Sequence, residues 1–196
     1  NQAEFYGEAG VDDDNNGYID DLYGFNFCYV GSSNTLRKTI EPGTHGTHVA
    51  GSIAAVSNNG IGISGIAGGN GSKDSGVRIM GVQTMEGAAN TPASIVYAAD
   101  NGAVIMNCSW GYDDTVVSQT PSSVVAAIDY FNEFAGVDIN GVQTGPMKGG
   151  LAVLAAGNSQ KTVAYPAMDD NVFAVASIGA DMFRSYYTNY GEWIDI

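Results

Sequence analysis

Positive charge is scarce in this chain. Its 196 residues include 7 lysines and arginines against 21 aspartates and glutamates, which gives a formal net charge of -14. Such an acidic chain is expected to bind neither nucleic acid nor an anionic membrane, because both carry negative charge; it is compatible with bound cations. No apolar run approaches the ~18 residues of a membrane span, and residues 1–27 lack the basic and apolar stretches of a signal peptide.

Cysteines are also few. Cys28 and Cys108 are the only two, and both lie in apolar, strand-like segments. Two cysteines do not build a disulfide framework, so the sequence predicts buried, unpaired thiols. Linkers and internal repeats are absent as well, since the 27 glycines are spread along the chain. With 44% apolar residues, the chain is predicted to form one globular domain over residues 1–196.

Short apolar runs alternate with helical patterns. Strands are predicted at residues 23–30, 77–84, 104–109, 151–156 and 172–177, with the start of another at 193–196. Helices are predicted at about residues 45–56 and from about residue 91, with a proline in the first turn and a stop at Gly102. A third begins with Thr120 as N-cap and Pro121 in the first turn, and three apolar residues share one of its faces: Val124, Ile128 and Phe131. This order indicates an α/β fold with a parallel sheet flanked by helices. Sites in such folds gather at the carboxyl ends of the strands.

A glycine-rich segment at residues 68–73 (GGNGSK) raises the alternative of a nucleotide-binding domain. It lacks the Gly-Lys-Ser/Thr ending of a phosphate-binding loop, and no helical pattern follows at once. This alternative is therefore disfavoured.

The most informative segment is Gly-Thr-His-Gly-Thr-His-Val-Ala-Gly at residues 43–51. Its two histidines do not have the spacing of a zinc metalloprotease helix, and the glutamate of that motif is missing. A general base instead needs a neutral imidazole on a rigid element with one free side. Small residues would let such a helix pack closely in the interior and leave His45 in its exposed first turn. These small residues are Gly46, Thr47, Ala50 and Gly51.

This histidine segment closely resembles the catalytic histidine helix of the subtilisin family. The resemblance implies that His45 is the catalytic base and that His48 is a structural histidine facing inward. It also implies a subtilisin-like α/β core over residues 23–196, preceded by an acidic segment at residues 1–22.

Two further segments resemble the same family in the same order. Residues 59–67 are similar to its glycine-rich segment, and residues 97–111 are similar to the helix and strand that lead to its substrate-binding segment. By this resemblance, Ser109, Trp110 and Gly111 are expected to pair with extended substrate backbone. Pairing of this kind is strand addition, in which main-chain bonds give affinity and side pockets give specificity.

The run Leu-Ala-Ala-Gly-Asn that ends at Asn158 matches the oxyanion element of the family. The resemblance implies that the Asn158 amide donates to the negative charge that develops on the carbonyl oxygen during acyl transfer. Ala155, Ala156 and Gly157 would form one wall of a pocket for a large apolar substrate side chain. Later segments extend the resemblance to about residues 41–196.

The family's triad runs Asp, His, Ser along the chain. Neither the Asp-Thr-Gly pattern after an apolar strand nor the Gly-Thr-Ser start of a helix occurs here. The isolated chain is therefore predicted to be an inactive internal piece of a serine endopeptidase that acts on polypeptides. The alternative is a non-catalytic, subtilisin-like module that binds peptide or calcium. Without the family's first strand, unpaired sheet edges are expected to favour a homo-oligomer.

The run Asp-Asp-Asp-Asn-Asn-Gly-Tyr-Ile-Asp-Asp at residues 12–21 fits a calcium loop, with Gly17 where the loop turns sharply. Tyr23 stands where an EF-hand has its final glutamate. The predicted Ca2+ ligands are the side chains of Asp12, Asp14, Asn16 and Asp20 and the carbonyl of Tyr18. The alternative is an acidic turn capped by its own Asp and Asn side chains. The family resemblance and the calcium loop together imply a secreted or cell-surface protein.

Overall fold

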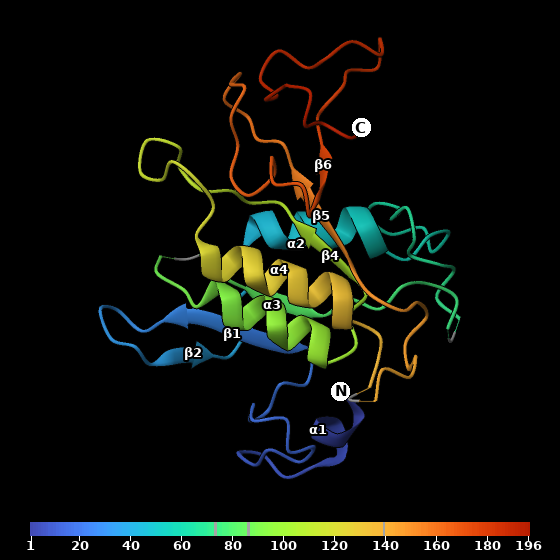
Figure 1. Cartoon of the computed structure of the whole chain (residues 1–196). Helices are drawn as coiled ribbons and strands as arrows, with labels where there is room; N and C mark the ends of the chain where they lie inside the picture. Colours follow the sequence, from blue (N-terminus) through green and yellow to red (C-terminus); the bar gives the residue numbers. More distant parts are fainter. Residues whose placement is uncertain (73, 86, 139) are drawn as a thin grey trace. The chain divides into compact units, whose positions relative to one another are not determined.

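The computed structural model describes residues 1–72, 74–85, 87–138 and 140–196 (Figure 1). The chain divides into two compact units, the N-terminal unit Asn1–Ala89 and the C-terminal unit Asn90–Ile196. The N-terminal unit contains α1 (Gln2–Tyr6), β1 (Gly24–Tyr29), β2 (Leu36–Lys38), α2 (Thr44–Ala54) and β3 (Gly81–Gln83). The C-terminal unit contains α3 (Thr91–Asp100), β4 (Ile105–Cys108), α4 (Ser122–Phe134), β5 (Leu151–Ala155) and β6 (Phe173–Val175).

The core of the N-terminal unit is β1, which lies between antiparallel β2 and parallel β3. Phe25 and Phe27 are buried, and their rings contact the ring of Tyr18 edge-on, with centroids 4.8 and 5.7 Å away. Asn26 is also fully buried, because its side chain donates to the Thr39 carbonyl and accepts from the Cys28 amide. The predicted strand at 23–30 is thus confirmed, whereas β2 and α1 were not predicted.

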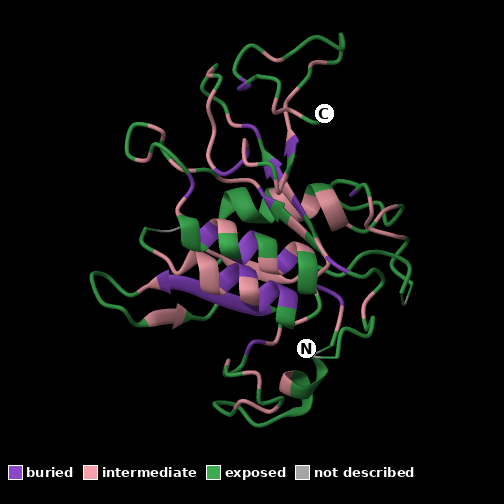
Figure 2. Ribbon diagram, viewed as in Figure 1, coloured by how far each residue is buried: buried purple, intermediate pink, exposed green. Residues whose placement is uncertain are grey.

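Helix α2 is held at its C-terminal end and open elsewhere. The amides of Gly65, Ile66 and Ala67 donate to the carbonyls of the helix's last turn and C-cap. None of its residues is buried, and a Cβ on Gly46 would meet no atom within 4 Å (Figure 2). The prediction that small residues pack this helix in an interior is therefore wrong for this unit. Lys73, at the end of the glycine-rich segment 68–73, lies outside the described residues.

The C-terminal unit is built on a fully parallel sheet in the order β4-β5-β6. Helices α3 and α4 pack on each other, and α4 lies against β5. Helix α4 buries Val124, Ile128 and Phe131, the three residues predicted to share one face (Figure 2). Helix α3 has a proline in its first turn and ends before Gly102, whose φ is +89°, as the sequence predicted.

Two predicted details differ. Helix α4 begins one residue later than expected: Pro121 occupies the N-cap position with extended backbone, and Thr120 is buried without capping the helix. Residues 193–196 form no strand. The last residue nevertheless bonds on both sides of Val175 in β6: the Ile196 amide donates to the Ala174 carbonyl at 3.3 Å, and the Ile196 carbonyl accepts from the Ala176 amide at 2.8 Å. The Asp195 carboxylate accepts from the Ala174 amide at 2.7 Å.

The described helices are short. The longest, α4, has 13 residues, and no helix in the described ranges is both long and apolar enough to cross a membrane. The described strands form two three-stranded sheets where the sequence predicted one, but the α/β class with parallel pairing and covering helices is confirmed.

Candidate functional site

The carboxyl edge of the C-terminal sheet brings together two of the predicted site segments. Strands β4 and β5 run parallel with Cys108 opposite Leu154. Ser109–Gly111 follows β4, and Ala155–Asn158 begins with the last residue of β5, so both segments lie at the same edge of the sheet. Such an edge is where ligands bind in open parallel sheets.

The first segment runs on from β4 as an open strand. Ser109 and Trp110 are half-buried, and the Trp110 ring contacts the Tyr112 ring edge-on at 5.7 Å. The Tyr112 amide donates to the Tyr165 carbonyl at 2.8 Å, which fixes the end of the segment. Within the part of the chain that the structure describes, no hydrogen bond joins the main chain of Trp110 or Gly111 to other backbone groups. Among the described residues, this segment therefore has main-chain groups that no neighbouring strand uses.

The thiol beside this segment is inert. Burial raises the pKa of Cys108 to about 12, and a hydrogen bond with Trp110 offsets only part of that rise. Because the thiolate is the reactive form, Cys108 is a packing residue of the sheet rather than a nucleophile. Both cysteines are free and buried, as the sequence predicted.

The second segment turns sharply out of β5. Ala155 is exposed, Ala156 is buried at 1% exposure, and Gly157 has φ +100°, a value that an L side chain rarely adopts. The Asn158 side chain is exposed just beyond the turn. Of the three residues predicted to line a substrate pocket, Ala155 and Gly157 are accessible, while Ala156 packs inward.

One residue of this region was missed by the sequence reasoning, which placed it only in a later family segment. Asn189 is 5% exposed, and its carboxamide oxygen accepts from the amides of Ser159 and Lys161 at 2.9 and 3.1 Å. The main-chain amide of Asn189 donates to the Gly157 carbonyl at 2.9 Å. These partners lie about thirty residues earlier in the chain, so no local pattern identifies them.

The predicted general base, His45, lies in the N-terminal unit. His45 is exposed in the first turn of α2, as predicted. His48 is also exposed, so the inward orientation implied by the family resemblance is not found; α2 buries no residue and therefore offers His48 no interior. His45 belongs to the N-terminal unit and Asn158 to the C-terminal unit.

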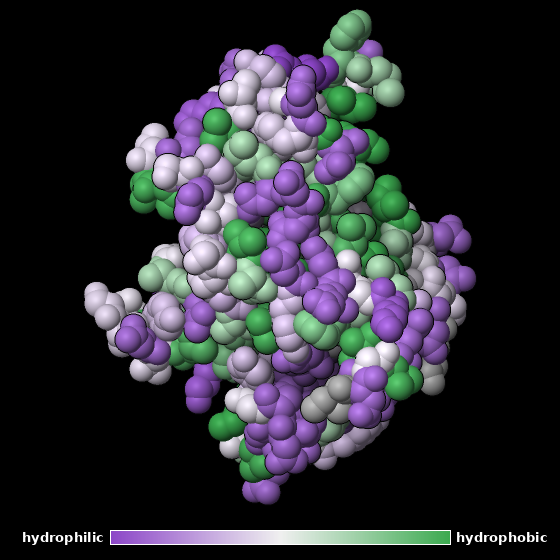
Figure 3. All heavy atoms as spheres, in the orientation of Figure 1, coloured by the Kyte–Doolittle hydropathy of each residue, from purple (hydrophilic) through white to green (hydrophobic). Residues whose placement is uncertain are grey.

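The acidic N-terminal segment gathers three carboxylates. Oxygens of Glu4, Asp12 and Asp14 lie within 4.8 Å of one another. Figure 3 shows hydrophilic atoms over the end of the molecule where Figure 1 places this segment. Asp12 accepts from the amides of Asn16 and Gly17 at 3.1 and 2.8 Å, and φ of Gly17 is +91°, which confirms the predicted sharp turn.

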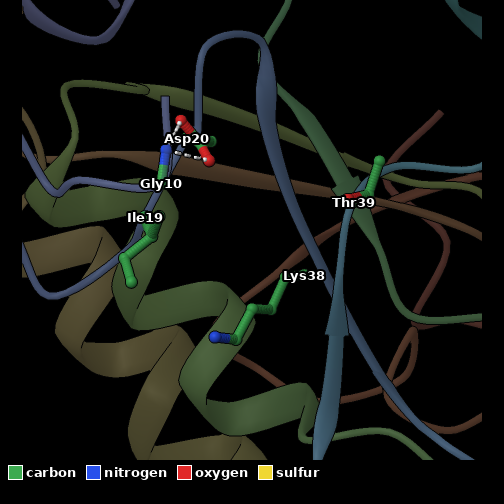
Figure 4. Close-up of a pocket in the computed structure, with 5 residues that line it drawn as sticks. All are labelled: Gly10, Ile19, Asp20, Lys38 and Thr39. Atoms are coloured by element: carbon green, nitrogen blue, oxygen red, sulfur yellow. Dashed lines mark hydrogen bonds between the residues drawn. The ribbon is translucent and has the colours of Figure 1, made fainter. Parts of the chain in front are cut away.

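Asp20, which the sequence assigned to the calcium ligands, is not part of that cluster among the described residues. Both of its carboxylate oxygens accept from the Gly10 amide at 3.0 Å. It lines a separate hollow of about 320 Å³ together with Ile19, Lys38 and Thr39 (Figure 4). Glu4 takes the place in the cluster instead, because its two oxygens accept from the amides of Asp13 and Asp20 and so hold it over the loop.

Comparison with known proteins finds subtilase-family serine proteases. A sequence model of the subtilase family matches residues 12–196. The chain is 32% identical over 158 residues to a thermophilic serine proteinase of Bacillus sp. AK1, covering 78% of this chain and 33% of the relative. It is 36% identical over 158 residues to thermitase of Thermoactinomyces vulgaris, covering 78% of this chain and 47% of that protein.

A solved structure of a subtilisin-like protease also resembles this chain. A psychrophilic subtilisin-like protease from the Antarctic Pseudoalteromonas sp. AS-11 superposes with a TM-score of 0.59 at 26% identity, covering 96% of this chain and 39% of that one. The chain thus spans between a third and a half of the length of these relatives.

Proposed function

Because the chain belongs to the subtilase family of serine proteases, we propose that it supplies the general base, the oxyanion donor and the substrate-binding edge of a serine endopeptidase. The register of β4 with β5 carries the proposal, since it sets Ser109–Gly111 and Ala155–Asn158 at one sheet edge. A peptide that pairs with the first segment then has its carbonyl groups beside the second.

His45 is the proposed general base. Its exposed position in the first turn of α2 leaves the imidazole free to accept a proton from a serine hydroxyl and to return it to the leaving amine. None of the serines in these 196 residues has the family's nucleophile context, so the nucleophile must come from outside them. We therefore propose that the 196-residue chain alone does not hydrolyse peptides.

Asn158 is the proposed oxyanion donor. Its side-chain NH2 donates to the oxygen of the tetrahedral intermediate, where negative charge is larger than on the bound peptide carbonyl. Ala155 and Gly157 leave room beside it for a large apolar substrate side chain, with Ala156 as support behind them.

We also propose that the acidic segment binds one Ca2+. Three carboxylates within 4.8 Å repel one another, and a hard divalent cation would relieve that repulsion through the oxygen ligands it prefers. The structure favours Glu4, Asp12 and Asp14 as the core of the ligand set, and Asn16 and Tyr18 lie in the same loop. The alternative, a turn capped by its own side chains, draws on the same Asp12 and Asp14 bonds and is decided by titration.

The remaining proposals concern partners and location. The substrate is a polypeptide, and neither nucleic acid nor a membrane is expected as a partner, given the net charge of -14. A secreted or cell-surface site suits a calcium-dependent protease, because calcium is abundant there. Open sheet edges favour a homo-oligomer; light scattering that shows a compact monomer would remove this proposal.

The test is Asn158→Ala in the protein as its natural gene encodes it, assayed on a chromogenic peptide. The variant is expected to lose about 10²–10³ in kcat, the range known for the corresponding donor of subtilisin itself, with little change in KM. Ser159→Ala is the matched control, because that exposed neighbour acts through its backbone amide alone. Full kcat in Asn158→Ala would remove the oxyanion role of Asn158. A wild type that cleaves no peptide and does not react with serine-directed phosphonyl reagents would favour the non-catalytic binding module.

A further inference from the structure

The loop that carries Asn158 forms several hydrogen bonds with one buried side chain, that of Asn189. The loop comprises residues 157–163, shortly after the end of β5. The Asn189 oxygen accepts from the amides of Ser159 and Lys161, and its NH2 group donates to the Val163 carbonyl at 3.3 Å. One carboxamide thus bonds the loop at residues 159, 161 and 163, and the main-chain amide of the same residue bonds the Gly157 carbonyl.

Gly157 packs closely against the same side chain, that of Asn189. The Gly157 carbonyl accepts from the main-chain amide of Asn189, and a Cβ at Gly157 would lie 2.8 Å from the side-chain Nδ2 of Asn189. The turn that aims Asn158 outward therefore depends on close contact between a glycine backbone and this carboxamide.

Asn189 itself is anchored to the sheet. Its neighbour Thr188 is 1% exposed and accepts from the Ser177 amide, just beyond β6. The Tyr190 amide donates to the Lys161 carbonyl, and the Trp193 indole donates to the Thr162 carbonyl, both at 3.0 Å. The run from Thr188 to Trp193 is therefore a brace between the end of β6 and the Asn158 loop.

We propose that Asn189 is a positioning residue for catalysis, which holds Asn158 where its amide meets the oxyanion. This inference rests on the proposed role of Asn158. Asn189 does not touch substrate; it acts through the loop it bonds. Oxyanion donors depend on being fixed in advance, and misplacement by about 1 Å can cost on the order of 10² in rate.

The chemistry of the clamp calls for a carboxamide. Two bonds need an acceptor and one needs a donor, and asparagine offers both from one short side chain. Asn189→Asp keeps the size and the acceptor but loses the donor to Val163, and it puts a negative charge beside a carbonyl in a buried site. The loop is then expected to loosen while the surrounding packing keeps its volume.

The deciding experiment is a double-mutant cycle in the full natural gene product, with kcat and KM measured on a chromogenic peptide. Asn189→Asp is expected to lower kcat about ten- to hundred-fold with little change in KM. In the Asn158→Ala background the same substitution is expected to add almost no further loss, because the group it positions is gone. An equal fold-loss in both backgrounds would overturn the inference and leave Asn189 a stability residue.

Two additional variants keep the outcome clear. Asn132→Asp makes the same chemical change in the same unit, where the carboxamide donates to the Asn171 carbonyl and its main chain bonds Gly150 before β5; kcat per folded molecule should not change. Trp193→Phe removes one bond of the brace and serves if Asn189→Asp does not fold; its smaller loss of kcat should also vanish with Asn158→Ala. If Asn158→Ala alone has full kcat, the proposed oxyanion role of Asn158 fails, which is a different result from additive losses.

Discussion

Two loops of this molecule use the same device with opposite chemistry. In the N-terminal unit, the exposed or half-buried carboxylates of Asp12 and Asp14 accept the loop's own amides. In the C-terminal unit, the buried and neutral carboxamide of Asn189 accepts the amides of the Asn158 loop. The carboxylates of the first loop stay charged, so the conformation of that loop can depend on a bound cation and on salt. The carboxamide of the second loop is neutral and buried, so its hydrogen bonds hold the loop rigid and are not screened by salt.

The helices of the two units differ in how many residues they bury. Helix α2 carries His45 and buries none of its residues, while α4 buries four along one face. In the N-terminal unit, the candidate base His45 therefore lies on a helix that adds no residue to the buried core. In the C-terminal unit, the candidate segment at Asn158 directly follows the buried strand β5. Each prediction below tests one side of this contrast.

The largest expected effect is on activity. His45→Ala should lower kcat of the natural gene product by about 10⁶, the size seen for the same loss in subtilisin, since proton transfer from the serine then has no base. The melting temperature should hardly move, because the residue is exposed. His48→Gln, three residues further along the helix, should lose far less; comparable losses in the two variants would contradict the assignment.

The next effect is on stability. Phe131→Ala removes a fully buried ring from α4 and should cost about 3–5 kcal/mol of unfolding free energy in urea titrations. Phe134→Ala, on the same helix but 45% exposed, is the control and should cost much less. Equal costs would mean that the core does not lie under α4, and the contrast with α2 would be lost.

Strands and helices with strong local signals could be predicted from the sequence. The apolar runs of β1, β4 and β5, and the proline and glycine that bound α3, carry their own structural preference. Strand β2 (Leu36–Lys38) has no such signal: it is short and polar, and it exists because it pairs with Asn26 and Tyr29 of β1. At residues 193–196 the predicted strand is not formed, and only Ile196 makes main-chain bonds on both sides of a β6 residue.

The candidate site divides in the same way. His45 and Asn158 could be named because each stands in a local motif. Glu4 could not, since it joins Asp12 and Asp14 only after α1 folds over the loop. Asn189 could not either, because its partners Ser159 and Lys161 lie about thirty residues away and its burial decides its role.

A moderate effect is expected from calcium. At a concentration of 100 times Kd, Ca2+ should stabilise the protein by about 2.7 kcal/mol, seen as a concentration-dependent rise in Tm. Asp12→Asn and Asp14→Asn should abolish most of this rise. Asp20→Asn should retain it, since Asp20 bonds to Gly10 instead. Loss of the rise in Asp20→Asn would restore the ligand set predicted from the sequence, and no rise in wild type would leave the loop a self-capped turn.

The smallest effect is expected at the two thiols, one in each unit. Burial raises the pKa of Cys108 to about 12 from 9.0, so the neutral thiol is favoured in the folded state and the stability it gives is present below pH 9.0 and lost as pH rises toward 12. At pH 8, iodoacetamide should therefore leave native Cys108 unmodified and label it once urea unfolds the unit. Cys28 is fully buried in the N-terminal unit and should be protected by packing. If Cys28 reacts in native protein while Cys108 does not, the N-terminal unit opens more readily, and the contrast between the two units extends from their surfaces to their cores.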